Sequence, residues 1–192
     1  MAQQRRVKLG KDGKPAPIRE DDLPMSRQEA ADLPGEAESC NCPRLEAEDW
    51  HEIESDWSDA AFLRGHMWAF MGVPIGYGAA RRKLFSRAQK TGSPAPDDAM
   101  VIIGSGRMRR PILLEVEDAP GSATRPGGIA FSRLVPAPMG RMKKMVGETV
   151  DIATKRYRRK PDAIWIWYLT CAVCSAPREF ETLIIAHYRD KK

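Results

Sequence analysis

The chain has 192 residues, of which 42% are hydrophobic and 30% are charged, and its formal net charge is +5. This length fits one domain with a tail, and the composition excludes a collagen-like or wholly disordered chain. No apolar run approaches the ~18 residues that a membrane-spanning helix needs. The charged and Pro-containing start also lacks the apolar stretch of a secretory signal. These features predict a cytoplasmic protein without a membrane span.

Residues 1–43 predict an extended N-terminal tail, because prolines and glycines interrupt them and their few apolar residues keep no sustained period. Within the tail, Ser26 and Glu29 have the spacing of a helix capping box, which indicates a short helical turn at 26–31. A single folded domain is then expected over residues 44–192.

The first elements of that domain are the least regular. A short strand or turn is expected near residues 50–57. Residues 59–71 predict a helix, although the apolar run 67–71 also fits a core strand. Residues 79–90 predict a clearer amphipathic helix, in which apolar residues recur every fourth position and basic residues face outward.

The middle of the chain predicts three short strands and one long helix. The strands are expected at 100–103, 112–116 and 129–135. The Gly-Ser-Gly sequence at 104–106 predicts a hairpin turn rather than a phosphate loop, because no third glycine and no Gly-Lys-Ser/Thr follow. Apolar residues at helical spacing predict a helix over 139–159.

The C-terminal segment predicts one strand and one ambiguous element. Residues 163–169 are β-branched and aromatic, as in a buried strand. A helix is favoured over residues 175–188, where an alternating strand fits nearly as well. This mixture favours the α+β class: a small mixed sheet, two or three packed helices and the extended tail.

Four cysteines form two close pairs, Cys40 with Cys42 and Cys171 with Cys174. Without a secretory signal, a disulfide framework is not expected. Thiolates at C-x-C and C-x-x-C spacing each supply two corners of a tetrahedron, so the two pairs predict one four-cysteine zinc site near the C-terminal strand. The same ligands also suit iron or an Fe–S cluster.

Two other roles for these thiols stay open: ordinary packing and redox chemistry. Strand, C-x-x-C and helix is the local order of a thioredoxin active site, which the residues at 168–174 superficially resemble. A C-x-x-C thiolate at a helix N-terminus is a good nucleophile. The 18 residues after Cys174 are too few for the strands that such a fold places after its motif.

The three histidines are weaker candidates. His66 and His187 lie among apolar residues, which predicts buried rings with ordinary hydrogen-bond partners. His51 stands beside Glu52 in an acidic stretch that is expected to be an exposed turn. It lies nine positions after Cys42, so it is also a candidate metal ligand.

Charge divides the chain into three parts, with a net charge of +4 over 1–20, −11 over 21–60 and +12 over 61–192. In one interpretation the acidic part neutralises the basic body within one molecule or oligomer. In the other, the body binds nucleic acid and the acidic part competes with it. No nucleic-acid-binding motif supports the second.

Together these features favour a metal-stabilised accessory or adaptor protein that binds another protein chain, or a second copy of itself, within an assembly. The alternatives are a thiol or Fe–S redox protein and a nucleic-acid-binding module. The sequence identifies no catalytic residue.

Overall fold

The computed structural model describes residues 8–9, 42–70, 73–106, 108–117, 121, 123–171 and 174–190. In this part of the chain, the helices are α1 (Ala47–Trp50), α2 (Tyr77–Lys90) and α3 (Met142–Tyr157), with the 3₁₀ turn η4 (Met139–Arg141) before α3. The strands are β1 (Lys8–Leu9), β2 (Ile53–Asp56), β3 (Ala61–Phe70), β4 (Val73–Ile75), β5 (Val101–Gly104), β6 (Arg109–Val116), β7 (Ile129–Pro136), β8 (Ala163–Tyr168) and β9 (Glu181–Tyr188).

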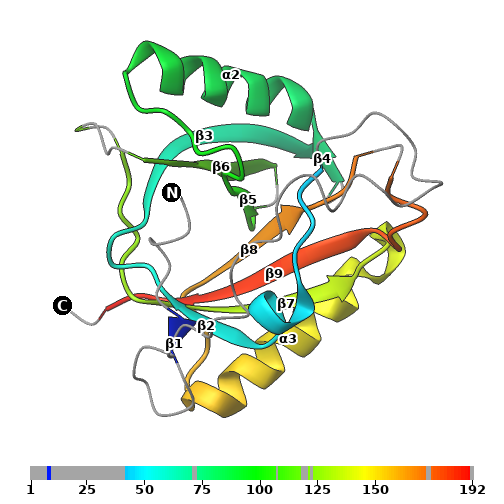
Figure 1. Cartoon of the computed structure of the whole chain (residues 1–192). Coiled ribbons are helices and arrows are strands. Elements are labelled where there is room, and N and C mark those ends of the chain that lie inside the picture. Colours follow the sequence, from blue (N-terminus) through cyan, green and yellow to red (C-terminus); the bar gives the residue numbers. More distant parts are fainter. Residues whose placement is uncertain are drawn as a thin grey trace, which may run out of the picture.

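The nine strands form one sheet in the order β1-β2-β7-β9-β8-β5-β6-β3-β4, and every pairing is antiparallel. The sheet bends so that its two halves face each other, with β3, β5 and β6 above β7, β8 and β9 (Figure 1). The halves join through β5 and β8, which share only two registered pairs, Ile103 with Ile166 and Gly104 with Trp165. This short join lets the halves turn relative to each other.

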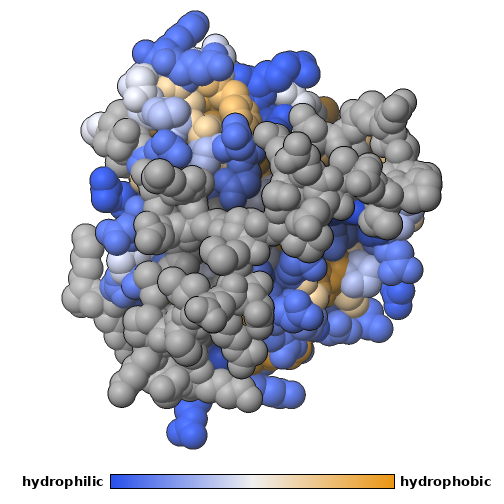
Figure 2. All heavy atoms as spheres, in the orientation of Figure 1, coloured by the Kyte–Doolittle hydropathy of each residue, from blue (hydrophilic) through white to orange (hydrophobic). Residues whose placement is uncertain are grey.

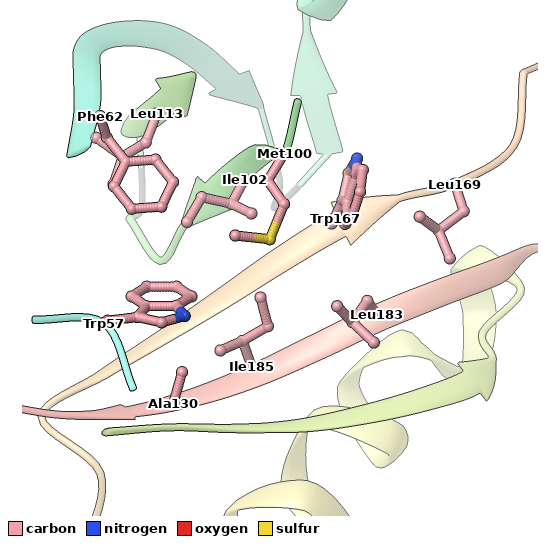
Figure 3. Packing of buried hydrophobic residues seen from close by; sticks show 10 residues of the cluster. All are labelled: Trp57, Phe62, Met100, Ile102, Leu113, Ala130, Trp167, Leu169, Leu183 and Ile185. Atoms are coloured by element: carbon pink, nitrogen blue, oxygen red, sulfur yellow. The ribbon is translucent and has the colours of Figure 1, made fainter. Parts of the chain in front are cut away.

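A hydrophobic core fills the space between the two halves of the sheet. Trp57, Ile102 and Trp167 point into it from different elements (Figure 3). The ring centroids of Trp57 and Phe62 lie 5.4 Å apart, and Phe62 is fully buried. Large aromatic side chains bury much apolar area, which stabilises the bent arrangement.

The outer faces of the sheet are each covered by one helix, α2 above and α3 below (Figure 1). Leu84 and Ala88 of α2 pack against β3, β5 and β6, and Ala153 of α3 packs with Phe131 of β7. The opposite face of α2 carries exposed basic residues, seen as the hydrophilic surface at the top of Figure 2. Central strands are therefore buried on both faces, and all four residues of β5 are buried.

The α+β class is confirmed, with a larger and wholly antiparallel sheet. The helices expected at 79–90 and 139–159 are α2 and α3, and the strands expected at 100–103, 112–116 and 129–135 are β5, β6 and β7. The Gly-Ser-Gly turn joins β5 to β6, which pair antiparallel as in a hairpin. The segment at 163–169 is β8.

Two predicted helices are wrong. The first, at 59–71, is the ten-residue strand β3, which pairs with β6 at eight positions. The second, at 175–188, consists of a turn and the strand β9, which lies between β7 and β8. Seven of the eight β9 residues are buried, so the alternating polarity of a surface strand is missing. Burial on both faces produced the ambiguity of β9, whereas in β3 the exposed Trp68 and Phe70 are apolar and hide the alternation of the strand.

The expected tail of residues 1–43 is described at only a few residues. Lys8–Leu9 forms the edge strand β1, paired with β2. The helical turn expected at 26–31 lies outside the described residues, as does Cys40. No helix of the described part is long and apolar enough to cross a membrane.

Candidate metal centre

Three of the four cysteines meet in space. Cys42 lies a few residues before α1, whereas Cys171 and Cys174 follow β8. The Sγ atoms of all three lie within 4.8 Å of one another, and those of Cys171 and Cys174 are 3.7 Å apart. Zn–S bonds of about 2.3 Å separate the sulfurs of a tetrahedral site by about 3.8 Å. The C-x-x-C pair therefore already has the spacing of two zinc ligands.

The backbone after β8 holds this pair in a tight turn. The Cys171 N–H donates to Cys174 Sγ at 3.3 Å, and the Ser175 N–H donates to the Cys171 carbonyl at 3.0 Å. The Arg178 N–H donates to the Cys174 carbonyl at 3.2 Å. An N–H that points at a sulfur stabilises the thiolate form that a metal requires.

Arg178 joins the two cysteine-bearing segments, a role that the sequence did not reveal. Its guanidinium donates to the Pro43 carbonyl at 2.8 Å and to the Leu169 carbonyl at 3.4 Å, and it pairs with Glu181. Burial disfavours its charge, but Glu181 and Cys174 outweigh this effect and raise the Arg178 pKa. Arg178 therefore fixes the residue next to Cys42 against the end of β8.

Two tyrosines stand beside the thiols. Tyr77 opens α2, and its ring meets that of Tyr168 edge to face with centroids 6.4 Å apart. Burial raises the pKa of the Tyr77 hydroxyl, and the neighbouring Cys42 acts in the same direction. All three cysteines are half-buried, so an ion at this position is partly screened from water.

Three thiolates suit a soft or borderline metal ion, and the chemistry of this donor set fits zinc or iron. Cys40, the predicted fourth ligand, lies outside the described residues. The helix expected after Cys174 is absent from the described residues, where a turn leads into β9. The helix-terminal activation of a thioredoxin-like thiol therefore has no counterpart here.

The histidines do not join this group. His51 Nδ1 lies 2.7 Å from the Leu134 carbonyl oxygen, and His51 is exposed. His187 is 1% exposed and Nε2 lies 2.7 Å from the Gly127 carbonyl oxygen, which confirms its predicted burial. The predicted burial of His66 is wrong: alternate β3 residues from Arg64 onward extend beyond the core, and His66 is exposed with them.

Among the described residues, two ion pairs of glutamates with arginines join the acidic part of the chain to the basic body. Glu54 of β2 lies 2.5 Å from a guanidinium nitrogen of Arg156 in α3. Glu52 lies 3.4 Å from Arg133 Nε. These ion pairs agree with neutralisation inside one molecule for this part of the acidic segment.

The fold and the three thiols define an α+β protein with a candidate thiolate metal centre. The family model described as bacterial hydrolase matches residues 32–185, more than three quarters of the chain. The chain therefore belongs to this bacterial hydrolase family, and the matched region contains all four cysteines. The comparison with curated proteins finds no match. The family description names an enzyme and does not fit the accessory protein that the sequence analysis favours.

Proposed function

We propose that this protein is a hydrolase whose fold is stabilised by one zinc ion, bound by Cys42, Cys171 and Cys174 together with Cys40. The observation that carries the zinc site is the convergence of three sulfurs from segments about 130 positions apart. Family membership supports the hydrolytic activity. The ion has a structural role in this proposal, and hydrolysis takes place elsewhere.

A structural role follows from the ligands and from their position. Four thiolates close a zinc site, whereas a catalytic zinc keeps one position open for water. A catalytic zinc also needs a general base beside it. Among the described residues, the cluster of three thiols contains no histidine that could serve as this base. Zinc joins the segment before α1 to the end of β8, so it closes a long loop and adds binding free energy to folding.

The test measures metal content and stability on the full chain. Elemental analysis is expected to find one equivalent of zinc, and Cys171→Ser with Cys174→Ser to remove it and to lower the Tm by roughly 10 °C or more. Ser86→Ala, on an exposed position of α2, is the control that changes neither. One equivalent of metal retained by the double variant would contradict the proposal, and a visible absorption band would assign iron instead.

Cys40→Ser separates a closed site from an open one. If Cys40 is the fourth ligand, this variant binds zinc more weakly than the parent chain because a water molecule replaces one thiolate. An unchanged zinc affinity would show that Cys40 is not a ligand. The ion would then keep an open coordination position, as a catalytic zinc does.

Protein binding is a second candidate function, favoured by one surface. Trp68, Phe70, Ile75 and Met108 are each more than half exposed at the β3, β4 and β6 end of the sheet. Large exposed apolar side chains mark interaction sites more often than ordinary surface. A second copy of the chain is the proposed partner. The molar mass in solution tests it: a dimer that Trp68→Ser disrupts supports it, and a monomer at all concentrations refutes it.

A further inference from the structure

A second feature of the molecule is a cavity of about 540 Å³ on the inner side of the bent sheet, and none of the described cysteines belongs to its lining. Residues of β3, β5, β6, β8 and β9 line it together with Ser105, the segment 124–126 and Arg189. Leu113 and Trp165, two of its lining residues, also pack against the core between the sheet halves. Small-molecule sites often lie in such concave openings of β-structures.

In the described part of the chain, three exposed arginines line the cavity: Arg64, Arg125 and Arg189. Two carboxylates lie close by, because the Arg189 N–H donates to Asp162 at 2.8 Å, and Asp162 and Asp190 both act on His187 of the wall. Among the described residues, none of these three guanidinium groups forms an ion pair with a carboxylate. Guanidinium groups bind phosphate and carboxylate groups through paired N–H donors. The cavity is therefore prepared for an anion.

Two buried polar atoms of the wall have no hydrogen-bond partner among the described residues: Trp165 Nε1 and His187 Nδ1. Because His187 Nε2 faces the Gly127 carbonyl oxygen at 2.7 Å, its proton lies on Nε2 and Nδ1 is left as an acceptor. Burial lowers the His187 pKa, which favours the neutral ring. Both atoms are buried from water, so they cost free energy and do not present a donor or an acceptor to a ligand in the cavity.

Glycines shape this wall. A Cβ on Gly104 would lie 2.8 Å from Trp165 Cζ3 and 2.7 Å from Pro111 Cγ, so only glycine lets the indole lie against β5. Gly127 has a φ of +61°, a conformation that favours glycine, and this turn presents its carbonyl to His187. Gly104 and Gly127 therefore position the rings of Trp165 and His187 in the wall.

We propose that this cavity is the substrate site and that it takes a phosphate ester, an inference that rests on the proposed hydrolase function. A phosphate monoester carries close to two negative charges near pH 7, which three guanidinium groups balance better than they would a single carboxylate. Its oxygens accept hydrogen bonds from the guanidinium groups of Arg64, Arg125 and Arg189. The organic part packs against the apolar wall of Leu113 and Trp165.

Calorimetric titration of the full, metal-assayed chain tests this site with inorganic phosphate and p-nitrophenyl phosphate as probes, at constant ionic strength. Both are expected to bind, and acetate is expected to bind at least tenfold more weakly. Arg64→Gln should raise the phosphate Kd at least tenfold, whereas Arg82→Gln, an exposed arginine of α2, should leave it unchanged.

Equal effects of Arg64→Gln and Arg82→Gln, or equal binding of acetate and phosphate, would overturn the assignment. Absence of phosphate binding to a protein that retains its zinc would refute the cavity proposal alone. A chain that contains no zinc but binds phosphate would refute the metal proposal alone. The failure of the cavity proposal and the failure of the metal proposal are therefore distinguishable.

Discussion

The contact of Arg178 with the two cysteine-bearing segments gives the sharpest prediction. Arg178→Met removes the guanidinium but keeps a side chain that fills similar space. The Pro43 and Leu169 carbonyls then lose a charged donor, at 2.8 and 3.4 Å, and Glu181 loses its ion-pair partner. The Arg178 side chain is only 17% exposed, so water replaces these contacts poorly.

The expected decrease in the free energy of unfolding follows from these contacts. A hydrogen bond from a charged donor contributes about 1.5–3 kcal/mol, and the longer of the two counts for less than the shorter. The ion pair with the partly exposed Glu181 adds up to about 1 kcal/mol. Arg178→Met should therefore lower the free energy of unfolding by about 3 kcal/mol, and weaken zinc binding because Cys42 is no longer held beside the C-x-x-C pair.

Urea unfolding with and without zinc measures the first effect, and zinc titration measures the second. Arg82→Met is the matched control, since it makes the same chemical change at an exposed position of α2 and should stay within about 0.5 kcal/mol of the parent. A loss below about 1 kcal/mol for Arg178→Met, with unchanged zinc affinity, would refute the proposed joining role.

Three further predictions concern the metal, the cavity and pH. A zinc chelator should lower the Tm of the parent chain and leave that of the Cys171→Ser, Cys174→Ser variant unchanged, and equal shifts in both would contradict this. Gly104→Ala should lower the Tm and weaken phosphate binding, since its Cβ would displace the Trp165 ring, and a Tm equal to that of the parent would contradict the close contact. Burial lowers the pKa of His187 below 6.5, so the unfolded chain binds more protons just below that pH. Stability should therefore fall as the pH drops below about 6.5, and His187→Gln should reduce this slope; equal slopes by urea unfolding between pH 7.5 and 5.5 would contradict it.

Local chemistry made several elements readable from the sequence. The basic and apolar residues of α2 alternate at helical spacing because only one face of that helix is buried. The strand β8 is β-branched and aromatic. The pairing of Cys171 with Cys174 is likewise local, because the spacing alone brings two thiols to adjacent ligand positions.

The strands β3 and β9 were predicted as helices, with a strand kept as the alternative for all or part of each segment. β9 lies inside the sheet and buries seven of its eight residues, so no alternation of polar and apolar residues marks it. In β3 the residues from Arg64 onward alternate between exposed and buried, but the exposed Trp68 and Phe70 are apolar and hide this period. The role of Arg178 could not be predicted from the sequence, because the carbonyl that accepts its hydrogen bond belongs to Pro43, 135 positions away. Backbone acceptors leave no signature in a sequence.

The sequence by itself supplied the side chains of the two candidate sites: paired thiols, which it marked as ligands of a soft metal ion, and arginines that suit an anion. Tertiary structure alone decided where these groups meet. The bend of the sheet between β5 and β8 brings Arg64, Trp165 and His187 to one cavity, and the turn before β9 brings Cys42 to the C-x-x-C pair. The physical reason is that burial of the aromatic core selects one folding of the sheet, and the positions of distant side chains follow from that choice.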